Sequence, residues 1–123
     1  MDNLFEIKGV VIKNKQRGRK LGFPTANIAS PPDEVPDGIF IGYTIIDGKK
    51  HKSLIFIGRA ETFGETERFA ESHILDFNED IYGKEVTLQG IKKLRDSRKF
   101  YDVKEMLDQM KEDEKIARVL LEE

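Results

Sequence analysis

The chain has 123 residues, of which 38% are hydrophobic and 36% are charged, so it can form one core and one ordinary domain. Its 21 Lys and Arg residues nearly balance 23 Asp and Glu, which argues against a dedicated nucleic-acid-binding protein. The absence of cysteine excludes disulfides and thiolate metal sites, and no apolar run is long enough to cross a membrane. With no signal segment at its start, the sequence predicts a soluble cytoplasmic domain over residues 1–123, and a monomer is the default expectation.

Strand signals fill the first two-thirds of the chain. Residues 4–12 mix apolar β-formers with charged residues in near alternation, and residues 39–46 have the composition of a buried strand. Asp47 and Gly48 follow at once, and this pair suits a type I′ hairpin turn into a returning strand. The other strand-like segments are residues 53–57, 71–77 and 85–91. Five or six short strands joined by turns are typical of a small antiparallel barrel, here spanning about residues 4–94.

The segment between the first two strands, residues 13–38, shows few strand features. It contains three closely spaced prolines, Pro31, Pro32 and Pro36. So long a connection in a compact domain is usually either functional or disordered. We therefore expect the chemistry of the protein to lie in this segment.

Helix signals fill the end of the chain, about residues 102–121. Asp102 and Glu105 have the spacing of a capping box. A stripe of apolar residues at helical spacing follows, formed by Val103, Met106, Leu107 and Met110. We expect this stripe to pack over one opening of the barrel and Asp113 to cap a second helical stretch.

The long segment contains a candidate phosphate-binding loop. Gly18 and Gly22 allow the backbone to turn tightly, and successive N–H groups in such a turn can bind an anion. Arg17, Arg19 and Lys20 add positive charge suited to a polyphosphate. The spacing matches neither a Walker A loop nor a dinucleotide fingerprint. A basic, solvent-exposed loop is the alternative, and the residues alone leave both interpretations open.

Two oxygen-bearing side chains follow this loop. Pro24 fixes its own φ and favours extended geometry, in which Thr25 and Asn27 point the same way. The hydroxyl and the amide oxygen could therefore converge on one hard cation such as Mg²⁺. Neutral oxygens bind Mg²⁺ weakly, so substrate phosphates would have to complete its coordination.

Glu71 is the candidate general base. Alternation along residues 71–77 places it on one face with His73, Leu75 and Phe77. Partial desolvation beside large apolar residues would make a carboxylate a better proton acceptor at neutral pH. A solvent-exposed glutamate at a strand end is the alternative. Neither histidine has the spacing of a metal site or a catalytic triad.

Three segments together resemble the riboflavin kinase family, including the kinase half of bacterial bifunctional FAD synthetases. They are GRKLGFPTAN at residues 18–27, ESHILDF at 71–77 with DIYG at 80–83, and LRDSRKF at 94–100. The resemblance runs over nearly the whole chain. It implies a six-stranded antiparallel Greek-key barrel with C-terminal helices, which phosphorylates riboflavin to FMN with Mg-ATP and releases ADP.

The resemblance also implies roles for individual residues. Thr25 and Asn27 would hold the magnesium, and Glu71 would accept the proton of the terminal ribityl hydroxyl. The flavin side would be shaped by Arg95, Arg98 and Phe100. The remaining nucleotide-binding residues would be Gly18, Arg19, Lys20, Gly22, Ile74, Asp76 and Tyr82.

The sequence departs from the family pattern at Asn14, Phe56, Glu61 and Ser97, which puts the affinity for the flavin acceptor in question. The adenylyltransferase part of the bifunctional enzymes is absent, so the chain could be a stand-alone kinase or an excised half.

Two other functions remain as alternatives. One is a catalytically silent flavin-binding module of the same fold. The other is a small RNA-binding barrel with a strip of basic residues, Lys13, Lys15, Arg17, Arg19 and Lys20.

Overall fold

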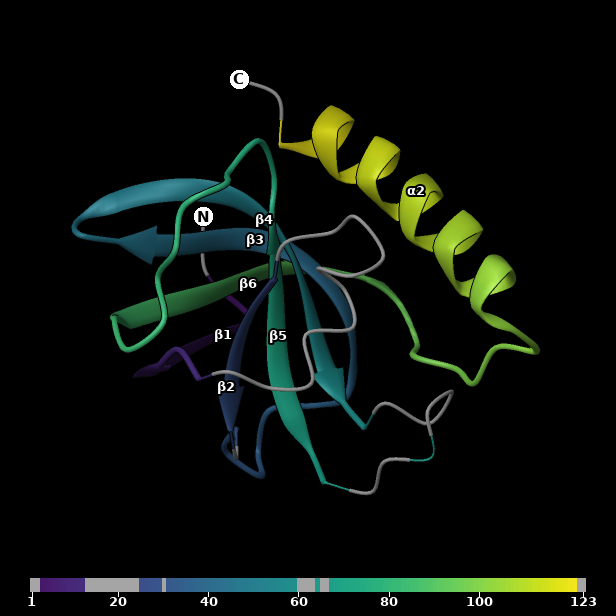
Figure 1. Ribbon diagram of the computed structural model, residues 1–123, viewed down its shortest axis with the longest axis horizontal. Coiled ribbons are helices and arrows are strands. Elements are labelled where there is room, and N and C mark those ends of the chain that lie inside the picture. Colours follow the sequence, from purple (N-terminus) through teal and green to yellow (C-terminus); the bar gives the residue numbers. More distant parts are fainter. Residues whose placement is uncertain (1–2, 13–24, 30, 60–63, 65–66, 122–123) are drawn as a thin grey trace.

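The computed structural model describes residues 3–12, 25–29, 31–59, 64 and 67–121 (Figure 1). In this part of the chain it shows six strands and one helix. The strands are β1 (Phe5–Val10), β2 (Thr25–Ala29), β3 (Gly38–Ile46), β4 (Lys49–Gly58), β5 (Phe69–Ile74) and β6 (Glu85–Arg95). The helix is α2 (Val103–Leu120). None of the described helical residues forms a stretch both long and apolar enough to span a membrane.

The six strands form one antiparallel sheet in the order β1-β6-β3-β4-β5-β2. Strands β3, β4 and β5 follow one another, and β6 returns to lie beside β3, which is the Greek-key arrangement. The predicted mainly-β, Greek-key architecture is therefore confirmed. Asp47 and Gly48 join β3 to β4 with φ angles of 51° and 80°, as a type I′ turn requires.

The sheet curls until its two edge strands meet. The N–H of Ile12, just beyond β1, donates to the carbonyl oxygen of Asn27 in β2 at 2.9 Å. Gly9 crosses β2 so closely that a Cβ there would lie 2.5 Å from the Ile28 side chain. The absence of a side chain at Gly9 therefore allows the two edges to approach.

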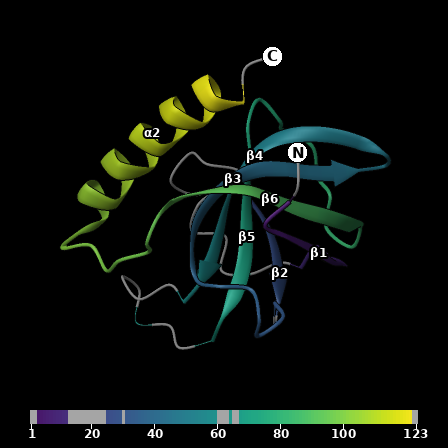
Figure 2. The same cartoon turned by 180° about the vertical axis from the view of Figure 1, so that it is seen from behind.

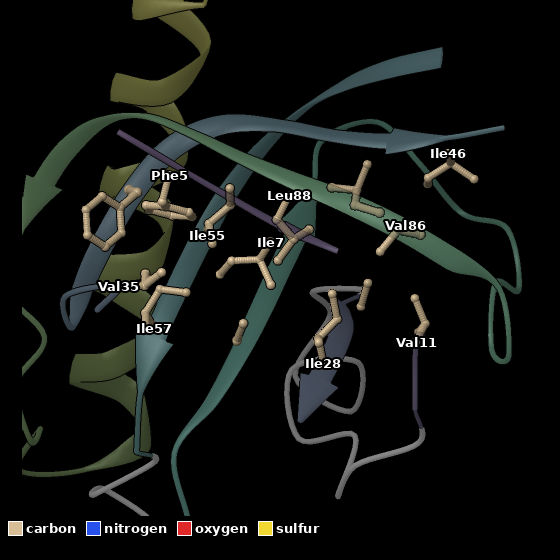
Figure 3. Close-up of a cluster of buried hydrophobic side chains, with 14 of the residues drawn as sticks. Phe5, Ile7, Val11, Ile28, Val35, Ile46, Ile55, Ile57, Val86 and Leu88 are labelled. Carbon is tan, nitrogen blue, oxygen red and sulfur yellow. The ribbon is translucent and has the colours of Figure 1, made fainter. Parts of the chain in front are cut away.

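The inside of the curled sheet is a hydrophobic core to which all six strands contribute (Figure 3). Buried residues such as Ile7, Ile28, Ile55 and Leu88 point toward one another there. Three buried hydroxyls complete the interior, since Thr44 Oγ1 lies 2.8 Å from Ser53 Oγ and 2.5 Å from Ser72 Oγ. Ser53 Oγ also donates to the carbonyl oxygen of His51 at 3.0 Å, so the three hydroxyls are satisfied, as burial of polar groups requires.

Strand β2 was not predicted as a separate strand, because it lies inside the segment expected to be a loop. Its five residues include two alanines and an asparagine, which have weak β-propensity. Pairing with β5 and burial of Ala26 and Ile28 in the core hold it in place. The extended geometry expected at Thr25 and Asn27 is nevertheless correct.

The prediction of a second C-terminal helix was wrong. The described residues form a single helix that continues through Asp113, which is buried in its interior and does not cap a new helix. At the start of α2 the Asp102 carboxylate accepts the Glu105 N–H at 2.8 Å, so the predicted N-cap is confirmed.

Helix α2 packs against the outer face of the sheet through its C-terminal half. Ala117 and the following Leu121 join a second buried cluster with Ile41, Leu54 and Leu75. The expected packing stripe near the start of α2 lies outside this cluster, with Met106, Leu107 and Met110 only half-buried. The start of the helix is accordingly farther from the strands than its end, in both views (Figures 1 and 2).

Candidate active site

Asn27 and Glu71 are directly opposed residues of the paired strands β2 and β5. Their neighbours Ala26, Ile28 and Ala70 belong to the interior core. Because strand residues alternate between faces, Asn27 and Glu71 both point to the outer face of the sheet. The candidate base and one candidate metal ligand therefore lie side by side.

The same line of residues continues across three more strands. Glu71 is paired with Phe56 of β4, Phe56 with Ile39 of β3, and Ile39 with Arg95 of β6. We call this line, Asn27-Glu71-Phe56-Ile39-Arg95, the outer row. It joins the candidate metal ligand, the candidate base and one candidate flavin residue on a single face of the sheet.

Asn27 has the features of a ligand-binding side chain. It is 3% exposed, and its Oδ1 is buried without a hydrogen-bond partner in the described part of the chain. An unsatisfied buried acceptor is costly and rare in folded proteins. A hard cation would satisfy this oxygen, since carboxamide oxygens are ligands that Mg²⁺ accepts.

Glu71 is half-buried and has Asn27 of β2 and Phe56 of β4 as its two neighbours in the outer row. Next along β5 on the same face, burial lowers the pKa of His73, although its neighbour Glu114 acts in the opposite direction. The alternation expected for this segment holds through Leu75, which packs against α2. It ends at Asp76, whose φ is 57°, so that Phe77 packs against the interior cluster.

The predicted nucleotide residues of the second motif occupy three different positions. Ile74 is buried in the interior core, on the face opposite Glu71. Asp76 is exposed and accepts hydrogen bonds from both Nη atoms of Arg118 in α2, at 2.8 and 3.0 Å, which lowers the pKa of its carboxyl. The structure does not bring these two side chains together.

Tyr82 lies in the turn that precedes β6 and packs partly against the interior core. The N–H of the next residue, Gly83, donates to the carbonyl oxygen of Val11 at 2.8 Å. Residue 12 in turn bridges to Asn27. Tyr82 is thus connected through two backbone contacts to the edge of the sheet that carries Asn27.

The three predicted flavin residues gather at the end of β6. Phe100 is buried, and the guanidinium carbon of Arg98 lies 4.3 Å from the centre of its ring. The corresponding carbon of Arg95 lies 5.8 Å from the same ring. The structure therefore brings all three together at one end of the outer row.

Several predicted residues lie outside the described part of the chain. They are Gly18, Arg19, Lys20 and Gly22 of the candidate phosphate loop, and their positions stay predictions. For Thr25 the structure describes the strand backbone, which is paired with His73, but not the side chain. The basic strip of the RNA-binding alternative also falls in this undescribed part.

Two residues of the site were not identified from the sequence. Phe56 was noted only as a departure from the family pattern, yet it is the neighbour of Glu71 in the outer row. The predicted role of Asp113 as a helix cap was wrong, because its carboxylate binds Arg95. A clue to Asp113 was present, since an aspartate flanked by apolar residues at helical spacing on a buried face needs a cationic partner.

A model of the riboflavin kinase family matches residues 1–121 of the chain. The trifunctional protein RibF/MnmA of Mycoplasmoides gallisepticum is 40% identical over 115 residues, which are 92% of this chain and 18% of that protein. The bifunctional riboflavin kinase/FMN adenylyltransferase of Bacillus subtilis is 33% identical over 90% of this chain and 37% of its own. The RNA-binding riboflavin kinase RibR of the same species is 34% identical over 87% of this chain and 47% of its own.

The chain therefore spans less than half the length of these relatives. Among solved structures, the riboflavin kinase of Trypanosoma brucei aligns with a TM-score of 0.67 at 22% identity. The alignment covers 96% of this chain and 80% of that one. This likeness supports the fold described above.

Proposed function

Because the chain belongs to the riboflavin kinase family, we propose that it transfers the γ-phosphoryl group of Mg-ATP to the terminal ribityl hydroxyl of riboflavin. The products are FMN and ADP. The observation that carries this proposal is the direct pairing of Asn27 with Glu71 on the outer face of the sheet. It places a candidate metal ligand beside a carboxylate that can orient the attacking hydroxyl.

The nucleotide side of the proposed site lies at the β2 edge. Asn27 Oδ1, buried without a partner in the described residues, and the Thr25 hydroxyl hold the metal together with the substrate phosphates. When bound, Mg²⁺ neutralises charge on the transferred phosphoryl group. In the proposal, Gly18, Arg19, Lys20 and Gly22 cradle the phosphates, and Asp76 and Tyr82 line the nucleotide pocket. Ile74 is left out of this pocket, because its side chain is buried in the interior core on the opposite face of the sheet from Asn27.

Glu71 acts on the acceptor. Its carboxylate accepts the proton of the ribityl hydroxyl while the hydroxyl oxygen forms a bond to the γ-phosphorus and the bond to the β-phosphate oxygen breaks. Its half-buried place next to Phe56 partly excludes water, which would compete as acceptor. Phosphoryl transfer demands little covalent chemistry from the protein, so positioning and charge neutralisation suffice.

The flavin side of the proposed site lies at the opposite end of the outer row. There the buried ring of Phe100 packs next to two guanidinium groups, Arg95 and Arg98, and so helps to shape this end of the row. Adjacent strands are separated by about 4.8 Å, so three strand spacings between Glu71 and Arg95 amount to about 14 Å along the curved sheet. An elongated acceptor with its hydroxyl at Glu71 and its ring toward Arg95 suits this separation.

The test is to incubate the chain with riboflavin, ATP and MgCl₂ and to separate the flavins by chromatography. The proposal requires FMN to form and the metal chelator EDTA to stop its formation. Flavin binding without FMN would support the catalytically silent module instead. RNA binding without FMN formation and without flavin binding would support the RNA-binding alternative. One relative, RibR, is named an RNA-binding riboflavin kinase.

A further inference from the structure

Asp113 is a buried carboxylate in the second half of α2, and its side chain is 4% exposed. Burial of a carboxylate is costly unless charged or polar groups surround it. Arg95 supplies them from the last position of β6, with Nη2 donating to Oδ2 at 2.7 Å and Nε donating to Oδ1 at 3.0 Å. Gln109, one turn earlier in the helix, donates to Oδ1 at 2.9 Å.

These contacts employ every nitrogen of the Arg95 guanidinium. Nε and Nη2 bind Asp113, and Nη1 donates to the carbonyl oxygen of Asp96 at 3.1 Å. The side chain is 21% exposed. Arg95 is therefore oriented by its own chain, and its paired geometry with Asp113 is the strong, bidentate kind.

The Arg95–Asp113 pair closes residues 96–112 into a loop. Arg98 and Phe100 lie inside this loop, and so does the half-buried apolar stripe at the start of α2. The described residues of the stripe do not join the cluster that packs α2 on the sheet, which uses Ala117 and Leu121. The position of residues 96–112 relative to the sheet therefore depends strongly on this pair.

Arg95 also belongs to the outer row that contains Glu71. We propose that Arg95 and Asp113 are positioning residues, which fix residues 96–112 against the outer row and so set the affinity for the flavin acceptor. Arg95 acts through Asp113 and does not bind the flavin itself. This inference rests on the proposed function for its kinetic part and on the geometry alone for its structural part.

The experiment compares Arg95→Gln, Asp113→Asn and the double variant with the wild-type chain. Steady-state rates are measured with riboflavin varied at saturating Mg-ATP and with Mg-ATP varied at saturating riboflavin. Each single variant should raise the KM for riboflavin about tenfold, in the range expected when a positioning group is lost, and leave the KM for ATP within about twofold. Because both residues form one unit, the double variant should resemble the singles.

The matched control is Asp108→Asn on the same helix. Asp108 is exposed and pairs with Lys104 across one turn at 3.1 Å, so its loss should leave both KM values unchanged. Arg95→Lys keeps the charge but not the bidentate geometry, and its KM for riboflavin should lie between those of wild type and Arg95→Gln. This variant also keeps the kinetic comparison possible if Asp113→Asn does not fold.

Amide hydrogen exchange of residues 103–112, measured without ligands, gives a readout independent of catalysis. Exchange should accelerate in Arg95→Gln and Asp113→Asn and stay unchanged in Asp108→Asn. Unchanged exchange in both Arg95→Gln and Asp113→Asn would overturn the inference, even if the protein has no kinase activity.

The kinetic data can also contradict the inference. A much larger rise in KM for riboflavin in Arg95→Gln than in Asp113→Asn, with additive effects in the double variant, would show that Arg95 binds the flavin directly. Absence of FMN from the wild-type chain would contradict the proposed function alone.

Discussion

Gly42 of β3 lies so close to Gln89 of β6 that a Cβ on Gly42 would be 1.8 Å from the Gln89 carbonyl oxygen. This contact adjoins one of two register shifts between the strands, the other lying between Ile39 and Phe40. The two shifts together bring Arg95 opposite Ile39 and hence into the outer row. The glycine therefore permits the strand approach on which the geometry of the site depends.

We predict that Gly42→Ala destabilises the fold by about 3 kcal/mol, because the added methyl group collides with backbone that cannot rotate away. Chemical denaturation followed by circular dichroism measures the change. Gly48→Asn is the control: Gly48 has a φ of 80°, no atom near its would-be Cβ, and a turn position that asparagine tolerates. A smaller decrease in unfolding free energy for Gly42→Ala than for Gly48→Asn would contradict this account of the β3–β6 contact.

Asn27→Leu should separate stability from nucleotide binding. Leucine has a similar shape and removes the buried oxygen that lacks a partner in the described residues, so the unfolding free energy should hold or rise by about 1 kcal/mol. Loss of the ligand should weaken Mg-ADP binding at least about tenfold in a calorimetric titration. Thr25→Ala should also weaken Mg-ADP binding. If both variants bind Mg-ADP with wild-type affinity, Asn27 and Thr25 are not metal ligands.

The stability of the ligand-free protein should fall as the pH is lowered from 7 to 5. Burial lowers the pKa of His73 in the folded state below the ordinary value near 6.5. The unfolded chain then binds a proton more readily than the folded one, so stability is full above about pH 6.5 and declines below it. Thermal melts at a series of pH values across this range should show a melting temperature that decreases as the pH falls. The slope of melting temperature against pH is the quantity to compare between variants.

His73→Gln should reduce that slope, because it removes the buried imidazole. His51→Gln removes the only other histidine of the chain and should retain the slope. The lowered pKa of Asp76 acts in the same direction but at more acidic pH, so it does not obscure the comparison. Equal slopes in wild type and His73→Gln would show that another group is responsible.

The parts of the fold set by local chemistry were predictable from the sequence. The Asp47-Gly48 turn has the left-handed angles that this pair favours, and the Asp102 cap is made by groups three residues apart. The alternation around Glu71 likewise placed it on one face with His73 and Leu75, because strand alternation needs no knowledge of the partner strand. The prediction failed for Phe77, because the chain turns at Asp76, and the sequence did not say which face of the sheet this was.

Features set by distant partners were not predictable. Strand β2 depends on pairing with β5, some 40 residues later, which compensates for the weak β-propensity of its alanines. Asp113 looks like a helix cap when only its neighbours are considered, and its burial makes sense only with Arg95 beside it. The register shifts in β6 leave no periodic signal, so the outer row could not be assembled from the sequence alone.

Glu71→Gln tests the central claim most directly. The amide keeps the size of the side chain and its place opposite Asn27 but cannot accept the hydroxyl proton. Single-turnover FMN formation from enzyme saturated with riboflavin and Mg-ATP should slow by about 10²–10⁴-fold, while the affinity for Mg-ADP stays at the wild-type value. FMN formation at the wild-type rate would contradict the account.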